Sequence, residues 1–396
     1  MNQPSRQVRL QFDAAAVALD SLSAVEIAGN YLFVAADEST SIERLKTADG
    51  GQSYAEQRSF PVADFFTLPV KGDEIDIEGL SVSHHYLWLV GSHSTKRQKP
   101  KPEETPQQQI ARIAKVKQEM KRYLLARIPI IKNQMSGEVM LCQSCPNPDV
   151  PTQLLTAAHL PYSERGNELM DALKDDEHLG LFISTSPPEN KNGHKENDKP
   201  PSLAIPGKDN GLDIEGLAAR GNRLFIGLRG PVLRGWAMIL EIEVKDAGGG
   251  HLALEKIGPN GRHYRKHFLK LNGLGLRDLY WQGNDLLILA GPTMDLDGPV
   301  HVFRWRGAAS ILEETITDQD KLPMILDVPY GGGQLTPCEE DAEPDVQKLG
   351  IDHAEGMALL ADGSAPPSLL IVYDAPKQAR KEGTNAVLAD VFTLNC

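Results

Sequence analysis

The chain has 396 residues and a formal net charge of −13 at pH 7. An acidic balance of this size argues against a nucleic-acid partner. No apolar run approaches the roughly 18 residues of a membrane-spanning helix, so we expect no membrane partner either. Residues 1–13 lack the apolar core of a secretory signal, and four cysteines are too few for a disulfide scaffold. The default expectation for localisation is therefore cytoplasmic.

The first predicted element is a strand from Gln7 to Phe12, where polar and apolar residues alternate. It belongs to no complete repeat. A short pattern then recurs along the chain, and its fullest copy runs from Leu212 to Pro231. In that copy Asp-Ile-Glu-Gly-Leu opens an apolar strand, Gly-Asn forms a tight turn, and a second apolar strand returns. Other copies open at Ser21, Asp76, Gly275 and His353.

Further strands follow each copy, so the predicted unit has four strands. The third strands are expected at residues 42–45, 123–128, 237–244, 300–305 and 386–394, and the fourth at 58–68, 153–160, 267–271 and 321–328. The last copy has no fourth strand, and the N-terminal strand fits that vacancy. A four-stranded unit repeated around a ring and closed by a strand from the other terminus is a β-propeller. The sequence thus predicts an all-β chain in which residues 1–396 form a single propeller domain of five blades. Six blades are the alternative, because residues 78–215 could hold another.

Two insertions interrupt the repeats. Residues 96–122 begin with a basic, proline-containing stretch, and Glu103 to Arg122 is predicted to be a helix with Ile110, Ile113 and Met120 toward one face. We expect this insertion to cover the rim of the propeller that carries the repeated Glu; a solvated helix facing outward is the alternative. Residues 161–203 hold a polar loop and a short helix near Glu168 to Leu173.

The antiparallel hairpin brings two sets of side chains to one rim. The repeated Glu begins the first strand, and the end of the second strand returns to the same side. Asp37, Ser92, Arg229 and Gly291 lie fourteen residues after the Glu position, and Asp374 ends the corresponding strand of the last copy. Mixed charges in a central concavity are typical of a ligand site. The candidate ligand-binding residues are Glu78, His93, Lys208, Glu215, Arg229, Arg277, His353, Glu355 and Asp374.

Two other readings of the repeated Glu stay open. It could be a joint that accepts hydrogen bonds from the backbone of a neighbouring blade, or Glu215 could pair with Arg229 across its own hairpin.

The residue types on this rim suggest two kinds of ligand. Carboxylates suit Ca²⁺ or Mg²⁺, and the candidate metal ligands are Asp76, Glu78, Asp213, Glu215 and Glu355. Arg229 and Arg277 suit a small anionic molecule, because arginine binds carboxylate or phosphate bidentately. His93 or His353 could act as a general base. The sequence assigns no catalytic residue beyond that.

The block from Pro206 to Leu217, followed by Ile226 to Pro231, resembles a bacterial family known only as a domain of unknown function, whose members are β-propellers. Gly91 to Arg97 is similar to a second block of that family, and the resemblance covers nearly the whole chain. The Asp-x-Glu-Gly-Leu element is also distantly similar to one in esterase-like and phytase-like propellers. This second resemblance implies hydrolysis of a phosphoester, ester or lactone at the mouth of the central channel.

Two functions are therefore carried forward. One is a metal-assisted hydrolase of a small anionic substrate. The alternative is a non-catalytic propeller that serves as a scaffold for a ligand or a protein partner.

Overall fold

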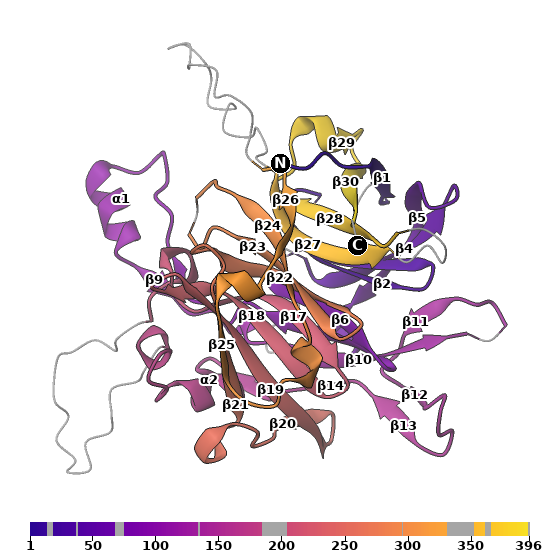
Figure 1. Ribbon diagram of the computed structural model, residues 1–396, viewed down its shortest axis with the longest axis horizontal. Helices are drawn as coiled ribbons and strands as arrows, with labels where there is room; N and C mark the ends of the chain where they lie inside the picture. Colours follow the sequence, from indigo (N-terminus) through magenta and orange to yellow (C-terminus); the bar gives the residue numbers. More distant parts are fainter. Residues whose placement is uncertain are drawn as a thin grey trace.

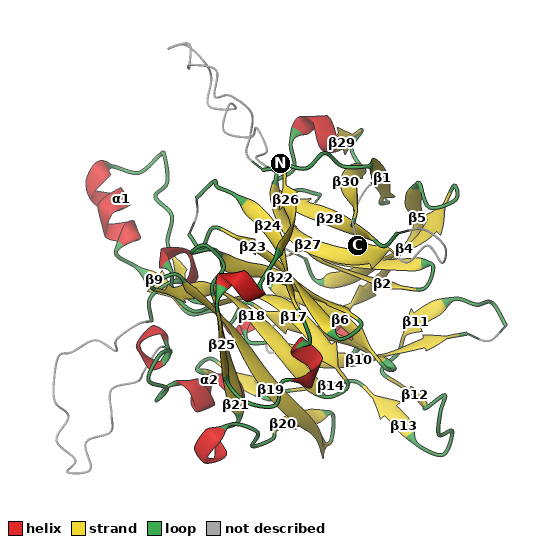
Figure 2. Ribbon diagram, viewed as in Figure 1, coloured by secondary structure: helices red, strands yellow, loops and turns green. Residues whose placement is uncertain are grey.

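The computed structural model describes residues 1–13, 19–36, 39–67, 75–133, 135–183, 204–294, 296–330, 352–360 and 366–394. Strands dominate it, and short helices lie at its edges (Figure 2). Asp37 and residues 184–203 of the second insertion lie outside the described residues. Among the described residues, no helix has the length and apolar character needed to span a membrane.

The chain is a β-propeller, and each blade is named here by its first strand. The β2 blade contains β2 (Leu22–Ala28), β3 (Tyr31–Ala36), β4 (Ser41–Ala48) and β5 (Ser53–Pro61). The β6 blade contains β6 (Ile77–Ser83), β7 (Tyr86–Gly91), β10 (Leu125–Lys132) and β14 (Ala158–His159), with β11 (Val139–Leu141) beside β10. The hairpins β12 (Ser144–Pro146) with β13 (Leu154–Thr156) and β15 (Tyr162–Ser163) with β16 (Gly166–Asn167) follow β11 and β14.

The remaining blades complete the ring. The β17 blade contains β17 (Asp213–Arg220), β18 (Arg223–Leu233), β19 (Trp236–Gly248), β20 (His251–Leu254) and β21 (Tyr264–Leu269), with β25 (Thr315–Thr317) beside β21. The β22 blade contains β22 (Gly275–Gln282), β23 (Asp285–Gly291), β24 (Val300–Trp305) and β26 (Met324–Val328). The β27 blade contains β27 (His353–Leu360), β28 (Ser368–Asp374), β30 (Ala386–Thr393) and β1 (Arg6–Gln11), with β29 (Lys381–Glu382) beside β30.

Within the described ranges, five hairpins carry the repeated pattern, and their first strands contact one another in a closed order: β2, β6, β17, β22, β27 and again β2. Figure 1 shows these strands gathered at the centre of the molecule. The number of blades in the whole chain stays a prediction.

The core lies between the blades. Phe33 of the β2 blade packs in one apolar cluster with Leu89 of the β6 blade, and a further cluster lies between each following pair of blades. The cluster that joins the β27 and β2 blades contains Val8 and Leu10 of β1. This arrangement explains why most inner strands are apolar on both faces, as in β3, whose six residues are all buried.

The N-terminal strand closes the ring, as the sequence predicts. β1 pairs antiparallel with β30, from Arg6 opposite Val391 to Gln11 opposite Ala386. It also pairs with the outer strand of the β2 blade, with Leu10 opposite Tyr54. Strand β1 therefore removes two exposed sheet edges at once.

The helix of the first insertion is shorter than predicted. α1 spans Pro106–Ile113, where Thr105 caps its N-terminus in a capping box. The chain then turns into β9 (Val116–Lys117), which pairs with β8 (Lys96–Arg97), and ends in a 3₁₀ turn, Met120–Arg122. The predicted apolar face is also wrong, because α1 lies outside the blades (Figure 1) and Ile110 is 70% exposed. In the second insertion, α2 spans Glu168–Leu173 as expected.

Candidate functional site

A β-bulge in each of the five described hairpins sets the direction of the side chain at the Glu position. The pairing register skips one residue of the first strand, so that this residue faces no partner on the second strand. Bulges redirect a side chain and bend the strand. The residues at the five bulges are Ser23, Glu78, Glu215, Arg277 and Glu355.

The glycine after the Glu follows from the packing of neighbouring blades. A Cβ at Gly79 would lie 2.8 Å from the Cβ of Leu217 in the next blade, and one at Gly216 would lie 3.1 Å from Leu279 Cγ. In these two copies the neighbouring first strand leaves too little room for a side chain without a shift. The Glu-Gly pair of the repeat is therefore explained by a bulge next to a close contact between strands.

Glu215 bridges two arginines at the mouth of the channel. Arg229 Nη1 donates to its Oε1 at 2.6 Å, and Arg277 Nη1 donates to its Oε2 at 3.1 Å. Arg277 Nη1 also lies 2.7 Å from Glu355 Oε1. These contacts join three consecutive blades. Glu215 pairs with Arg229 across its own hairpin, which was one of the two alternatives in the sequence analysis.

The other nitrogens of these two arginines also have partners. Arg229 donates to the carbonyls of Thr293 and Met294, and Arg277 donates to that of Pro292. Much of their hydrogen-bonding capacity is therefore directed at the protein itself, which limits their role as direct anion ligands.

Arg122, which the sequence analysis missed, supplies a third guanidinium to this site. Its Nη1 lies 2.9 Å from Asp76 Oδ2 and donates to the hydroxyls of Ser92 and Ser94. Ser92 occupies the position that Arg229 occupies in the β17 blade. The small Ser92 side chain leaves room for a cation from the insertion. The serine at a position where the β17 blade has an arginine was the signal in the sequence that could have indicated this cation.

The block around Lys208 is a tight turn that ties the insertion to the β17 blade. Asn210 has a left-handed backbone with φ of 64°, and its side-chain oxygen accepts the N–H of Val232 at 3.0 Å. A Cβ at Gly211 would lie 1.9 Å from a backbone oxygen. Asp209 pairs with Arg97 of β8 at 2.7 Å. This turn holds the exposed Lys208 beside the start of β17.

A cavity of about 330 Å³ lies at this rim. We call residues 96–122 the cover, because Lys96 to Pro100, Ile113 and Arg122 line the same cavity as the strand ends. The parts of the cover that line the cavity therefore lie over the Glu-bearing rim, as expected, whereas helix α1 has no buried residue, as in the alternative of a solvated helix. The predicted candidates that line the cavity are Asp76, Glu78, Lys208, Asp213, Glu215, Arg229, Glu355 and Asp374.

The carboxyl groups of the cavity differ in protonation. Burial would raise the pKa of Glu215, but Arg229 and Arg277 hold it below its usual value. Burial and the charges of Asp374 and Glu215 raise the pKa of Glu355 well above its usual value. Burial raises the pKa of Asp213 to about 6 despite Arg229 nearby, and it also raises that of Asp374. Carboxyl groups with opposite shifts share one cavity, which is a frequent feature of acid–base sites.

The two candidate histidines are not among the residues that line this cavity. His93 is 1% exposed, its Nδ1 lies 2.8 Å from the Gly91 carbonyl, and Asn167 contacts its Nε2 at 2.8 Å. Burial lowers its pKa to about 4, and both ring nitrogens contact protein groups. The role of His93 as a general base stays a prediction. His353 begins β27, opposite Asp374 in the register. Arg277 is also not among the residues that line the cavity, but it contacts two of them, Glu215 and Glu355.

Other residues make the joints between blades. Glu26 accepts the N–H of Val82 in the next blade at 2.8 Å, Ser81 accepts that of Ala219 at 3.0 Å, and Asp278 accepts that of Met357 at 2.8 Å. The sequence analysis proposed such joints for the repeated Glu, but Glu215 and Glu355 contact arginine side chains instead.

The metal candidates are in part engaged by arginines. Asp76 Oδ2 contacts Arg122, and both oxygens of Glu215 accept from guanidinium groups. In the part of the chain that the structure describes, no group of three or more His, Cys, Asp or Glu side chains is arranged to hold a metal ion. The assignment of Ca²⁺ or Mg²⁺ to Asp76, Glu78, Asp213, Glu215 and Glu355 stays a prediction.

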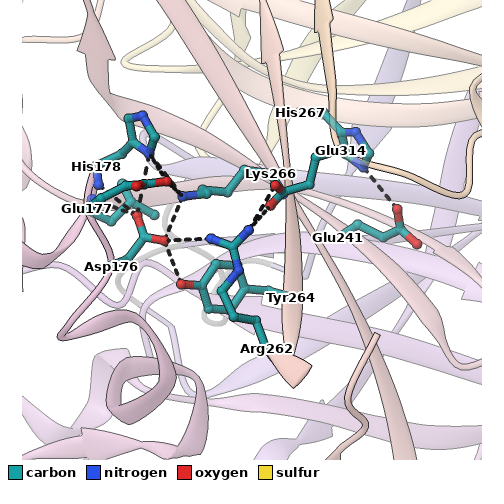
Figure 3. Close-up of polar contacts among 10 residues, drawn as sticks. Asp176, Glu177, His178, Glu241, Arg262, Tyr264, Lys266, His267 and Glu314 are labelled. Atoms are coloured by element: carbon teal, nitrogen blue, oxygen red, sulfur yellow. Dashed lines mark hydrogen bonds and ion pairs between the residues drawn. The ribbon is translucent and has the colours of Figure 1, made fainter. Parts of the chain in front are cut away.

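A second polar cluster, the Asp176 cluster, lies where the segment after α2 meets strand β21 (Figure 3). Asp176 accepts from Tyr264 Oη at 2.6 Å and from Lys266 Nζ at 2.7 Å, and Arg262 Nη1 approaches at 3.4 Å. Lys266 is 1% exposed and also contacts His178 Nδ1 at 2.9 Å. The cluster joins the second insertion to the β17 blade, so we interpret it as an anchor.

The fold and this rim define a β-propeller with a polar, charged cavity at the mouth of its central channel. A model of the family described as "Protein of unknown function (DUF3616)" matches residues 21–390. The chain belongs to this family. No curated protein sequence matches it.

Solved structures with a similar course of the chain include enzymes. Glutaminyl cyclase of Myxococcus xanthus is 10% identical, with 99% of this chain and 100% of that chain covered and a TM-score of 0.34. The aldose sugar dehydrogenase of Streptomyces coelicolor, in its PQQ-bound form, is 11% identical, with 98% and 100% covered and a TM-score of 0.34. A streptogramin B lyase is 10% identical, with 99% and 100% covered and a TM-score of 0.29. We infer no function from likenesses this weak.

Proposed function

We propose that the channel mouth binds a small anionic molecule and hydrolyses an ester-type bond in it, either a phosphoester or a lactone. The observation that carries the proposal is the covered cavity lined by carboxyl groups with different pKa shifts, raised for Asp213 and Glu355 and lowered for Glu215. A cavity of about 330 Å³ is near the lower end of the range for small-molecule sites, about 300–1,000 Å³.

Asp213 and Glu355 are the proposed acid–base pair. Asp213 has a pKa of about 6, so it is mostly ionised at neutral pH and can take a proton from water. The water oxygen then bonds to the carbonyl carbon or to phosphorus, and the bond to the leaving oxygen breaks. Glu355, whose pKa burial raises, gives its proton to that leaving oxygen. Arg122 and Arg229 face the same cavity and can stabilise the negative charge that develops.

The cover provides the reason to expect an anionic substrate. Lys96, Arg97 and Lys99 line the cavity from the cover, and Lys208 lines it from the neighbouring turn. A cluster of cations beside a small cavity attracts anions and raises their local concentration. The proposal does not require a metal ion, and the predicted divalent cation is tested separately below.

Turnover of a substrate panel tests the proposal. The panel contains p-nitrophenyl phosphate, glucose 6-phosphate and glucono-δ-lactone, and product release is followed directly. Asp213→Asn and Glu355→Gln are each expected to lower kcat by about 100-fold or more. Asp320→Asn, an exposed site in the 3₁₀ turn Gln319–Lys321, is the matched control and should leave kcat unchanged.

A non-catalytic ligand-binding or protein-binding scaffold is the second candidate. It is favoured by the ion pairs that Arg229 and Arg277 make within the protein, because these stabilise the ring whether or not a substrate binds. Binding of panel compounds without any product would support it over the hydrolase.

A further inference from the structure

The two sides of the cavity carry opposite charge. We call the first side the strand-end wall. Six carboxyl-bearing residues of this wall line the cavity, whereas its arginines are Arg229, which lines the cavity, and Arg277, which contacts two of the six. Arg122 of the cover contacts a third, Asp76. The six are Asp76, Glu78, Asp213, Glu215, Glu355 and Asp374.

The other side is basic. Lys96, Arg97 and Lys99 of the cover line the cavity, together with Lys208. Asp209 also lines the cavity on this side, but its carboxylate pairs with Arg97. The backbone holds this side in place, because Gln98 donates to the carbonyl of Lys115 at 3.0 Å. The separation of charge is therefore built into two defined elements.

Asp213 is a buried carboxyl group of the strand-end wall. Its residue is 5% exposed, and Arg229 Nη1 approaches its Oδ2 at 3.7 Å. Because Asp213 lines the cavity, a donor on a bound molecule can reach it. A hydrogen bond from that donor would offset part of the free-energy cost of burying the carboxylate.

We propose that the ligand is dipolar, with a protonated amine against the strand-end wall and a phosphate or carboxylate group against the cover. This inference rests on the proposed site at the channel mouth and names the chemical class of its ligand. An ammonium group has three donors and one positive charge, which matches a wall where carboxyl groups outnumber cations. The opposite charges at the two sides fix the orientation of the bound ligand.

Calorimetry with three matched probes tests the inference without relying on turnover. The probes are glucosamine 6-phosphate, glucose 6-phosphate, which lacks the amine, and glucosamine, which lacks the phosphate. We expect the first to bind at least about tenfold more tightly than either of the others, a difference of about 1.4 kcal/mol.

Variants assign each end of the probe to its side. Lys99→Met should weaken glucosamine 6-phosphate and leave glucosamine unchanged, whereas Asp374→Asn should weaken glucosamine 6-phosphate and leave glucose 6-phosphate unchanged. Lys132→Met at the end of β10 and Asp320→Asn are controls of the same chemistry outside the cavity. Melting temperatures close to that of the wild type would show that the variants are folded.

Several results would overturn the inference. These are equal affinity for glucose 6-phosphate and glucosamine 6-phosphate, no heat with any probe, or an effect of Lys99→Met no larger than that of Lys132→Met. Hydrolysis that is equally fast for substrates with and without an amine would overturn the inference while supporting the proposed hydrolase. Selective binding of glucosamine 6-phosphate without hydrolysis of any panel compound would do the reverse.

Discussion

Arg277 of β22 lies against Glu355 of β27, with Nη1 2.7 Å from Oε1. The same nitrogen contacts Glu215 of β17 at 3.1 Å. One guanidinium thus joins three neighbouring blades at their bulge positions, where the residues of the other two blades are glutamates. The substitution of Arg for Glu in this one copy supplies the charge that lets the other acidic residues come together.

Removal of that cation should destabilise the ring more at high pH than at low pH. Arg277→Met takes one of two guanidinium partners from the buried Glu215 carboxylate, and we expect a loss of about 3–5 kcal/mol near neutral pH. Protonation of Glu215 should recover part of this loss at pH 5. Chemical denaturation at both pH values measures it. Equal losses at both pH values would contradict this explanation.

The joint at Glu26 should make stability depend on pH. Burial raises the pKa of Glu26 from 4.5 to about 7, so the folded state keeps this proton when the unfolded state has lost it. The stabilisation is complete below pH 4.5 and is lost as the pH rises toward 7. It amounts to about 3 kcal/mol, at about 1.4 kcal/mol for each pKa unit.

Comparison with Glu26→Gln isolates this effect. The difference in free energy of unfolding between the wild type and the variant should shrink by that amount between pH 4.5 and 7. A difference that stays constant over this range would show that Glu26 is ionised in the folded protein.

The Asp176 cluster offers a test of the second insertion. Lys266→Met leaves the buried Asp176 carboxylate without its nearest cation, and we expect a loss of about 3–5 kcal/mol. Lys245→Met is the matched control in the same blade, because its pair with Glu255 is exposed and worth about 0–1 kcal/mol. Similar losses for both variants would contradict the role of Lys266 as an anchor.

Closure by β1 is tested by its removal. Deletion of residues 1–13 exposes the edges of β30 and β5 and removes Val8 and Leu10 from the core. We expect aggregation or loss of a cooperative melting transition. Arg9→Ala, at an exposed ion pair with Glu382, is the control and should melt like the wild type. An unchanged transition in the deletion variant would refute closure.

The repeat allowed the fold and one rim to be predicted, because strand periodicity and turn pairs are local signals. The strand β1 and the helix α2 were placed correctly because their signals are also local. The end of α1 was missed because pairing of Val116 and Lys117 with β8 is a tertiary contact that overrides helix propensity.

The candidate site was predicted in outline only. Position on the rim could be inferred from the offset of fourteen residues, but burial could not: His93 is 1% exposed and is not among the residues that line the cavity. Arg122 was missed because it belongs to the cover, a segment without a repeat pattern in the sequence, so its contact with Asp76 could not be inferred.

The metal assignment has a separate test. The wild type and Glu78→Gln are titrated with Ca²⁺ and with Mg²⁺ after treatment with a chelator. If a divalent ion binds among the predicted ligands, the wild type should gain thermal stability and the variant should gain less. No gain with either ion would refute the assignment.

The pH dependence of turnover tests the central claim most directly. With Asp213 as the base, kcat/KM of the wild type on its best phosphoester or lactone should rise along a limb centred near pH 6. It should fall again at higher pH as Glu355 loses its proton, and Glu355→Gln should remove that fall along with most of the activity. Absence of turnover at every pH, or a falling limb that is unchanged in Glu355→Gln, would contradict the account.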